Sequence, residues 1–394
     1  MNLFVAMIVI STLCGVEVDL FAPSLPEIRH YFGLSNFMVQ LLLSVNFVAY
    51  CIFSLFAGAL GDRFNRRHII LLGLWLFVIG SILCVFAGNF TLLLIGRCLQ
   101  GMGAACPFAL LFAELIDSYP REKHAGLIAL MNGVTTVAMA FAPVIGSYVN
   151  VWFDWRGNFT LLLILGVVSL VMGHFTLPQR SGDPSVNISA KAYLPLLKSP
   201  QLMTLILGIG LLIVPYWVFI GMSPILYIEG FKVSLQHFGL YQGAIAAAFA
   251  ILSFLSPKIL AYTGQRRCLF YGLILLIISV IFILGLTVTD VRNPLSITLV
   301  MIFLSISVLF PLTLLFPLAV EILPNAKGRS TALILAIRLI LTAIFLQTVS
   351  YFYRGSFVPI GMAMLICLIL FLLAVLLLYR KQWIVFGDES HLPS

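Results

Sequence analysis

The sequence predicts an all-α membrane protein with twelve transmembrane helices in two six-helix pseudo-repeats. Of its 394 residues, 62% are hydrophobic and 9% are charged, whereas charged residues make up about 25% of soluble domains. The chain contains twelve apolar stretches, each close to the length of about 20 residues that spans a bilayer. Residues of the first half also recur in the second half. The first two observations exclude an ordinary soluble protein, and the third predicts the two pseudo-repeats.

The twelve stretches follow one another along the chain and are separated by short polar connections. They cover residues 3–25, 37–60, 68–88, 90–116, 125–149, 157–177, 201–228, 237–260, 268–288, 295–319, 329–350 and 356–379. We do not expect the first stretch to be a cleaved signal peptide, because it lacks a basic start and contains Glu17 and Asp19.

Positive charge is distributed unevenly between the two sides of the expected helices. With a cytoplasmic N-terminus, fifteen of the 22 Lys and Arg residues fall in cytoplasmic segments and five in outer ones, while Arg97 and Arg338 fall within helices. Basic residues concentrate in the cytoplasmic loops of membrane proteins, so we expect both termini in the cytoplasm. The net charge of +8 is therefore interpreted as an orientation signal, and no nucleic-acid partner is expected.

Two short motifs recur about half a chain length later. Leu60, Arg66 and Arg67 recur after 200 positions as Leu260, Arg266 and Arg267, and Asp117, Pro120 and Lys123 recur after 204 positions as Glu321, Pro324 and Lys327. This duplication predicts a first six-helix bundle, a cytoplasmic linker, a second six-helix bundle and a cytoplasmic tail. These units cover residues 1–177, 178–200, 201–380 and 381–394.

A charged stretch joins the second and third expected helices: Gly58-Ala59-Leu60-Gly61-Asp62-Arg63-Phe64-Asn65-Arg66-Arg67. It resembles the loop between helices two and three of the major facilitator superfamily, whose pattern is Gly-x-Leu-x-Asp-Arg-x-Gly-Arg-Arg. Asn65 replaces the family glycine, and Asn tolerates a left-handed backbone better than most residues. The resemblance implies the major facilitator fold. In the second repeat Tyr262 stands at the place of Asp62, so we expect that loop to be structural.

The same resemblance implies a conformational latch between the two halves. Asp62 would lie against the N-terminus of the eleventh helix, near Gly328–Ser330, where free N–H groups favour a carboxylate. Arg63 would then pair with Glu114 or Asp117. The latch residues are Gly58, Asp62, Arg63, Arg67, Glu114 and Asp117. The alternative is that these charges serve only to orient the chain in the membrane.

Charged side chains inside a bilayer are costly unless they are paired or hydrated, which makes them candidate functional residues. The run that starts at Asp19 resembles the Asp-x-x-x-Pro-x-x-Pro segment of Bcr/CflA-type drug/proton antiporters. The run that starts at Arg97 resembles the helix-four motif Arg-x-x-Gln-Gly-x-Gly-Ala-Ala of the same family. We therefore expect Asp19, beside Arg97, to carry a proton or to couple to substrate. The alternative is a buried ion pair that holds helices one and four together.

Glu17 is the second proton-coupling candidate. It lies two residues before Asp19, so the two side chains point about 200° apart on a helix. We expect Glu17 to be the one that lies at the outer interface, hydrated from outside.

The fifth expected helix contains a run of small residues, among them Ala142, Pro143 and Gly146. Their spacing resembles an antiporter signature of the superfamily, although most of its glycines are replaced. Small residues allow helices to approach closely, so these three form a candidate hinge. A generic packing seam is the alternative.

A substrate cavity is expected around Arg338 in the eleventh helix, because a cation there would attract a carboxylate substrate. Tyr216, Trp217 and Phe219 in the seventh helix would line the same cavity. Further hydrogen bonds to substrate are expected from Gln40, Asn46 and Gln347. The alternatives are an internally paired or snorkelling Arg338 and aromatic side chains that only pack.

Together these features predict a proton-coupled secondary transporter that exports small organic molecules by alternating access. The alternatives are transport, in either direction, of an anionic metabolite such as a carboxylate siderophore, and a membrane sensor that moves nothing. The sequence shows no enzyme motif, phosphate-binding loop or metal-ligand spacing. We therefore expect no enzyme activity, metal or cofactor, with the proton gradient as energy source. The expected protein is a multi-pass monomer of a bacterial inner membrane, whose partners are lipid and a small-molecule substrate.

Overall fold

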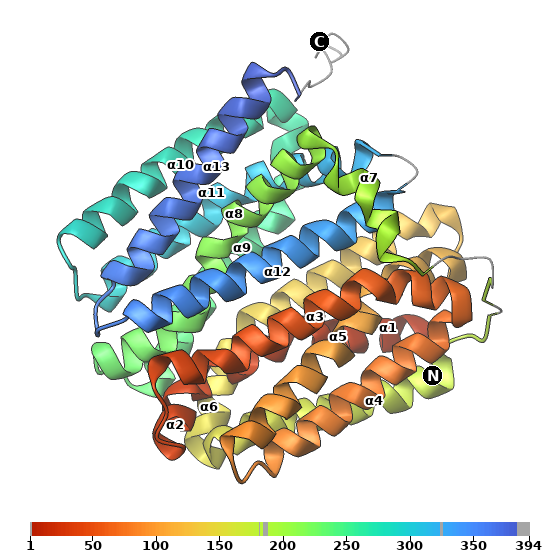
Figure 1. Ribbon diagram of the computed structural model, residues 1–394, viewed down its shortest axis with the longest axis horizontal. Helices are drawn as coiled ribbons and strands as arrows, with labels where there is room; N and C mark the ends of the chain where they lie inside the picture. The colour runs from red at the N-terminus through yellow and green to blue at the C-terminus, as the bar shows by residue number, and fades with distance from the viewer. Residues whose placement is uncertain (1, 181, 184–187, 324–325, 384–394) are drawn as a thin grey trace.

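The computed structural model describes residues 2–180, 182–183, 188–323 and 326–383. Part of the expected linker, Pro324 of the repeated motif and residues 384–394 of the expected tail lie outside this range. Figure 1 shows the path of the chain from red to blue. Its helices are α1 (Leu3–Phe21), α2 (Leu25–Tyr31), α3 (Asn36–Phe64), α4 (Arg66–Val85), α5 (Phe90–Ser118), α6 (Arg121–Thr176), α7 (Leu194–Leu197), α8 (Pro200–Pro224), α9 (Leu235–Thr263), α10 (Gln265–Val288), α11 (Pro294–Glu321), α12 (Lys327–Phe352) and α13 (Val358–Arg380).

The expected all-helical membrane fold is confirmed. The described residues form helices and no strand, and eleven continuous helical stretches are long and apolar enough to cross a bilayer. The longest, α6, contains both the fifth and the sixth expected helix. Its backbone is not helical at Phe153 and Asp154, so the chain turns there and all twelve expected helices are present.

The first membrane helix is longer than expected. It was expected to end at residue 25, but the helical path continues from α1 through a 3-10 turn (Ala22–Ser24) into α2 and ends at Tyr31. Pro23 and Pro26 lie in this segment. Since proline has no backbone N–H, the regular α-helical ladder is interrupted there without ending the helix.

The connection between the second and third membrane helices, expected within the charged stretch, is a single residue, Asn65. Its φ is +133°, and its side-chain oxygen accepts a hydrogen bond from the Arg67 N–H at 3.0 Å, which caps the start of α4. Gly264, with φ +81°, makes the equivalent break between α9 and α10. The two breaks are 199 positions apart, one fewer than the sequence motifs suggested. Ala261, and not Tyr262, therefore stands at the place of Asp62.

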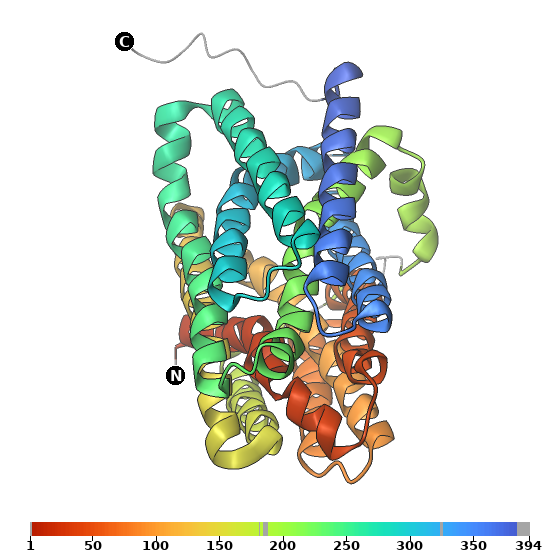
Figure 2. The ribbon, with the colours of Figure 1, turned by 90° about the vertical axis from the view of Figure 1, so that its left-hand side faces the viewer.

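The two halves of the chain lie side by side. The helices of the first half, red to yellow, occupy one side in both views and those of the second half, green to blue, the other (Figures 1 and 2). Between the halves, α3 packs along α12 and α6 packs along α9. We call the end of the bundle with the N-terminus and α7 the linker face, and the end with the connection between α2 and α3 the opposite face.

Candidate functional site

The membrane-embedded charges of the first half form one buried cluster. Arg97 on α5 is fully buried and Glu17 on α1 is 3% exposed, and the Arg97 Nη1 lies 4.0 Å from a Glu17 oxygen. Asn46 on α3 donates a hydrogen bond to the same Glu17 oxygen at 3.3 Å and another to the Arg97 carbonyl at 3.2 Å. The cluster therefore joins three helices.

Arg97 is also held by its own helix and by α3. Its guanidinium donates to the Leu42 carbonyl at 3.3 Å and to the Gln100 side chain at 2.7 Å. It also lies over the Phe21 ring, 4.1 Å from the centroid. Gln100 in turn donates to Ser81 on α4 at 2.8 Å. The Arg97 motif of the sequence thus positions a guanidinium between the helices.

The glycines of the same motif permit this close packing. A side chain at Gly101 would overlap the backbone of Asn46 on α3, and one at Gly103 would overlap that of Phe77 on α4. Only a residue without a Cβ lets α5 approach both neighbours so closely.

The environment of Glu17 is the one expected for Asp19. We expected Asp19 beside Arg97 and Glu17 in contact with outer water, but Glu17 is the partner of Arg97. Asp19 is 4% exposed and makes no hydrogen bond or ion pair with any described residue. The reason is that α1 presents the Glu17 side of the helix to α5. Asp19 is therefore a buried carboxyl group without a counter-charge.

The candidate hinge in α6 packs directly against α1 and α9. Ala142, Pro143 and Gly146 are buried, and a side chain at Gly146 would overlap the carbonyl of Leu20. Gly239 of α9 meets the same segment at Pro143. The small residues therefore lie where the two halves touch, next to the helix that carries both acids.

Three contacts join the halves near the opposite face. Gln40 donates to the Gly221 carbonyl at 2.7 Å, and Gln347 donates to the Ser44 hydroxyl at 2.8 Å. Glu229 pairs with Arg29 and His30. Gln40 and Gln347, expected as substrate contacts, thus bond the other half of the protein. These contacts hold the two halves together near the opposite face.

A cavity of about 350 Å³ lies within the second half. Arg338 and Thr313 are the polar residues that line it, and the other lining residues are apolar: Ile213, Leu312, Phe316, Pro317, Ile334 and Leu335. These residues come from α8 and from the parts of α11 and α12 nearer the linker face. Arg338 thus lines a cavity, but none of the other residues expected to share a substrate cavity with it lines this one.

The three aromatic residues expected in that cavity lie elsewhere. Phe219 is 1% exposed and packs on Tyr227, 6.1 Å between ring centroids. Tyr216 packs on Trp217, which in turn meets Phe47 on α3. Their arrangement is that of side chains that pack within and between the halves.

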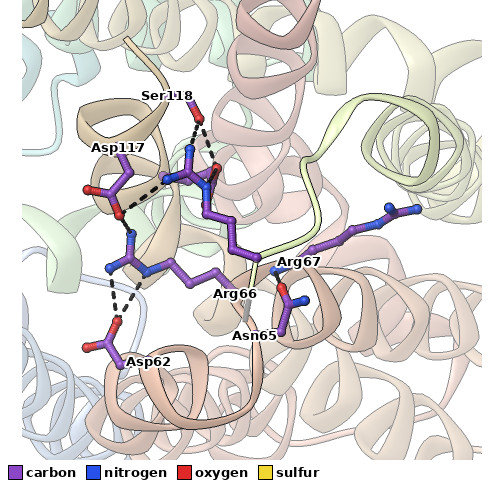
Figure 3. Close-up of polar contacts among 8 residues, drawn as sticks. Asp62, Asn65, Arg66, Arg67, Asp117 and Ser118 are labelled. Atoms are coloured by element: carbon purple, nitrogen blue, oxygen red, sulfur yellow. Dashed lines mark hydrogen bonds and ion pairs between the residues drawn. The ribbon is translucent and has the colours of Figure 1, made fainter. Parts of the chain in front are cut away.

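The charged loop forms a polar network with partners other than those expected (Figure 3). Arg66 donates to Asp62 at 3.0 and 3.1 Å and also pairs with Asp117. The Asp62 carboxylate therefore binds Arg66, and not the start of α12. α3 ends at Phe64 and α4 starts at Arg66, so the single-residue connection at Asn65 brings Arg66 within reach of the acid. Arg63 forms no ion pair with a described residue.

Two further members of the expected latch have distinct surroundings. Arg67 donates to the His174 carbonyl at the end of α6 at 2.7 Å. A methyl group added at Gly58 would meet no atom within 4 Å, so packing does not require a glycine there.

Sequence reasoning missed Arg180, which follows α6 at the linker face. Its guanidinium lies 3.3 Å from Glu114 and 3.9 Å from Asp117, and it donates to Ser118 at 2.9 Å. Arg180 thus takes the place that we expected Arg63 to occupy. Its position directly after the sixth membrane helix could have marked it as a partner for the acids at the end of the fourth, in addition to indicating the orientation of the chain.

The linker itself touches both halves. Tyr193 donates to the Leu55 carbonyl of α3 at 2.6 Å, and Arg329 of α12 donates to the Ala192 carbonyl at 2.9 Å. Burial raises the pKa of the Tyr193 hydroxyl, and Arg329 opposes that rise. No group of three or more His, Cys, Asp or Glu side chains that could hold a metal occurs in the described ranges.

Two bundles of membrane helices lie side by side, and charged side chains are buried between the helices. This is the architecture of a membrane transporter of the major facilitator type. Residues 6–346 match the family model described as Major Facilitator Superfamily. The chain belongs to this superfamily and is a multi-pass membrane transporter, not an enzyme.

Characterised relatives carry a more specific description. The chain is 27% identical over 278 residues to "Multidrug resistance protein MdtL" of Shigella dysenteriae serotype 1 (strain Sd197), covering 70% of this chain and 69% of the relative. It is 26% identical over 273 residues to the protein of the same name in Escherichia coli O157:H7, covering 69% and 68%.

Solved structures share the fold at low sequence identity. A bacterial homologue of the human lysosomal transporter Spinster matches with a TM-score of 0.74 at 17% identity, covering 97% of this chain and 96% of that chain. A D-xylose–proton symporter matches with a TM-score of 0.74 at 15% identity, covering 93% and 96%. The peptide transporter POT, in complex with sulfate, matches with a TM-score of 0.79 at 13% identity, covering 96% and 94%.

Proposed function

We propose that this protein exports small organic molecules in exchange for protons across a bacterial inner membrane, with the linker face and both termini in the cytoplasm. The relatives named for multidrug resistance support export. The concentration of Lys and Arg in segments at the linker face supports the orientation.

The observation that carries the proposal is the isolated carboxyl group of Asp19. A charged carboxylate in a nonpolar environment is strongly unfavourable without a partner, whereas its protonated form is tolerated. Asp19 is buried and has no counter-charge among the described residues. It therefore holds a proton in the conformation seen here and releases it when water reaches the group.

Glu17 and Arg97 complete the coupling site in a different role. Their ion pair lies two residues from Asp19 on the same helix and ties α1 to α5. A movement of α1 relative to α5 changes this pair and the access of water to Asp19 together. Proton release can thus be linked to the change between a conformation with a closed opposite face and one with an open opposite face.

The test uses purified protein in vesicles with an imposed pH gradient and two fluorescent organic molecules, ethidium and 2-naphthoate. The wild type moves at least one of them in a gradient-dependent manner, with matching proton flux. Asp19→Asn, a neutral group of the same size, abolishes gradient-driven accumulation and keeps exchange of labelled for unlabelled substrate. Asp290→Asn, at an acid in the connection between α10 and α11, serves as the control and transports normally.

Two results would overturn the proposal. Full gradient-driven accumulation by Asp19→Asn would remove the proton role of this residue. Absence of any flux of these or related organic molecules, with intact helical structure, would favour the sensor alternative.

A further inference from the structure

Arg338 is a membrane-embedded cation whose side chain has no counter-charge in the described part of the chain. Its Nε is buried and makes no hydrogen bond, and the guanidinium forms no ion pair with a described residue. Arg97, the other arginine that the sequence places inside a membrane-spanning stretch, has Glu17, Gln100 and a backbone carbonyl as partners. A guanidinium in such a place is expected to have an anionic partner.

The depth of Arg338 excludes the membrane surface as the source of that partner. It lies eleven residues after Lys327, the first residue of α12, which corresponds to about 16 Å along a helix. This is half of the roughly 30 Å thickness of the hydrocarbon core. The phosphates of the lipid headgroups are therefore out of reach, and an anion must arrive through the cavity.

The cavity walls indicate what else the ligand must contain. Leu312, Phe316 and Ile334 are among the apolar residues that line it, and its volume of about 350 Å³ is near the lower end of small-molecule sites. An inorganic anion alone would leave most of this apolar surface uncovered. A flat or compact nonpolar group attached to the anionic group would cover it.

Thr313 is the second polar residue among those that line the cavity. Thr313 and Pro317 both line the cavity and lie four residues apart on α11. Pro317 has no N–H to donate to the Thr313 carbonyl, so this carbonyl lacks its usual donor within the helix. A ligand with a hydrogen-bond donor at its far end would satisfy it.

We propose that the Arg338 cavity is a binding site for amphipathic organic anions, with the guanidinium bound to a carboxylate or sulfonate and the apolar part of the ligand against α8, α11 and α12. This proposal specifies a class of substrate, and it therefore rests on the proposed transport function. An Arg–carboxylate interaction in a nonpolar cavity is charge-assisted and can be bidentate. It therefore selects anions over neutral or cationic molecules of the same shape.

The test measures binding to purified full-length protein in detergent by titration calorimetry. The probes share one ring system and differ in charge: 2-naphthoate, 2-naphthamide and (2-naphthylmethyl)trimethylammonium. We expect 2-naphthoate to bind at least about tenfold more tightly than the other two. Arg338→Ala removes that preference and weakens 2-naphthoate binding at least about tenfold, while binding of 2-naphthamide changes little.

Arg354→Ala is the matched control, since it removes an exposed arginine beyond the end of α12 and should leave all three affinities unchanged. Arg338→Gln, which keeps a hydrogen-bonding side chain of similar length, replaces the Ala variant should that variant lose its helical signal. Equal affinities for the three probes, or undiminished 2-naphthoate binding by both Arg338 variants, would overturn the proposal.

The binding measurement contains no pH gradient and no membrane. Its outcome is therefore independent of proton coupling at Asp19. Arg338-dependent binding without gradient-driven flux would contradict only the transport proposal. Gradient-driven flux without anion selectivity at Arg338 would contradict only the anion site.

Discussion

His30 and Glu229 occupy equivalent positions in the two halves of the chain and contact each other across the boundary between them. The His30 Nε2 lies 3.1 Å from a Glu229 oxygen, and Arg29 binds the other oxygen of the same carboxylate. The two residues are 199 positions apart, as are the helix-capping residues Ser35 and Ser234. Equivalent residues of a repeat meet only near the axis that relates the halves. This cluster therefore lies close to the axis that relates the two halves.

Neutralising Glu229 should favour the open form of the opposite face. Glu229→Gln removes an ion pair that is only partly exposed, worth about 1 kcal/mol, which corresponds to a severalfold change in the population of the closed form. The closed form can be measured in a variant without native cysteines that carries Ser44→Cys and Gln347→Cys, joined by a short bifunctional thiol reagent, since the Gln347 side-chain nitrogen lies 2.8 Å from the Ser44 hydroxyl. Cross-linking should slow severalfold.

Glu122→Gln, at an exposed acid of the linker face, is the control for Glu229→Gln. Its cross-linking rate should equal that of the parent. An unchanged rate in Glu229→Gln would show that the acid does not hold the opposite face closed.

Arg97 and Glu17 should depend on each other energetically. Removing Arg97 alone leaves a buried carboxylate without its partner, which typically costs about 3 kcal/mol or more. Arg97→Gln should therefore lower the unfolding temperature in detergent strongly, and the double variant Glu17→Gln, Arg97→Gln should recover much of the loss. Additive losses would mean that the 4.0 Å contact contributes no coupling.

Gly146 should tolerate no side chain. The added methyl group of Gly146→Ala would overlap the Leu20 carbonyl, so α1 and α6 must separate, at a cost of about 1–3 kcal/mol. Gly126→Ala lies in the same helix with no atom within 4 Å of the new group and should retain its stability. Thermal unfolding of the purified variants tests the comparison, and equal unfolding temperatures would contradict it.

Arg66, and not Arg63, should be the arginine on which the linker-face network depends. Arg66→Ala removes contacts with Asp62 and Asp117, whereas Arg63 has no ion pair to lose within the described residues. We expect the transport rate to fall severalfold in Arg66→Ala and to stay near the parent value in Arg63→Ala. The loss of stability should be small, about 1 kcal/mol, because exposed ion pairs contribute little. A larger effect of Arg63→Ala on transport would restore the pairing expected from sequence.

Much of the site could be found in the sequence because membrane-embedded charges are rare. Glu17, Asp19, Arg97 and Arg338 stand out against apolar surroundings, and each is a candidate for that reason alone. Which acid binds Arg97 could not be read from the same pattern, because it depends on how α1 is rotated against α5. Gln40 and Gln347 were recognised as polar, but their partners Gly221 and Ser44 belong to the other half.

The sequence by itself determined the number of membrane helices, the duplication and the presence of a connection in the charged stretch, because apolar length and backbone preference are local properties. Tertiary structure alone decided that Arg180 binds Glu114, that Glu229 contacts His30 of the other half and that Asp19 has no partner within the described residues. Those pairings arise from the rotation and contact of helices distant in the chain. Hydropathy is the same for every rotation of an apolar helix about its axis.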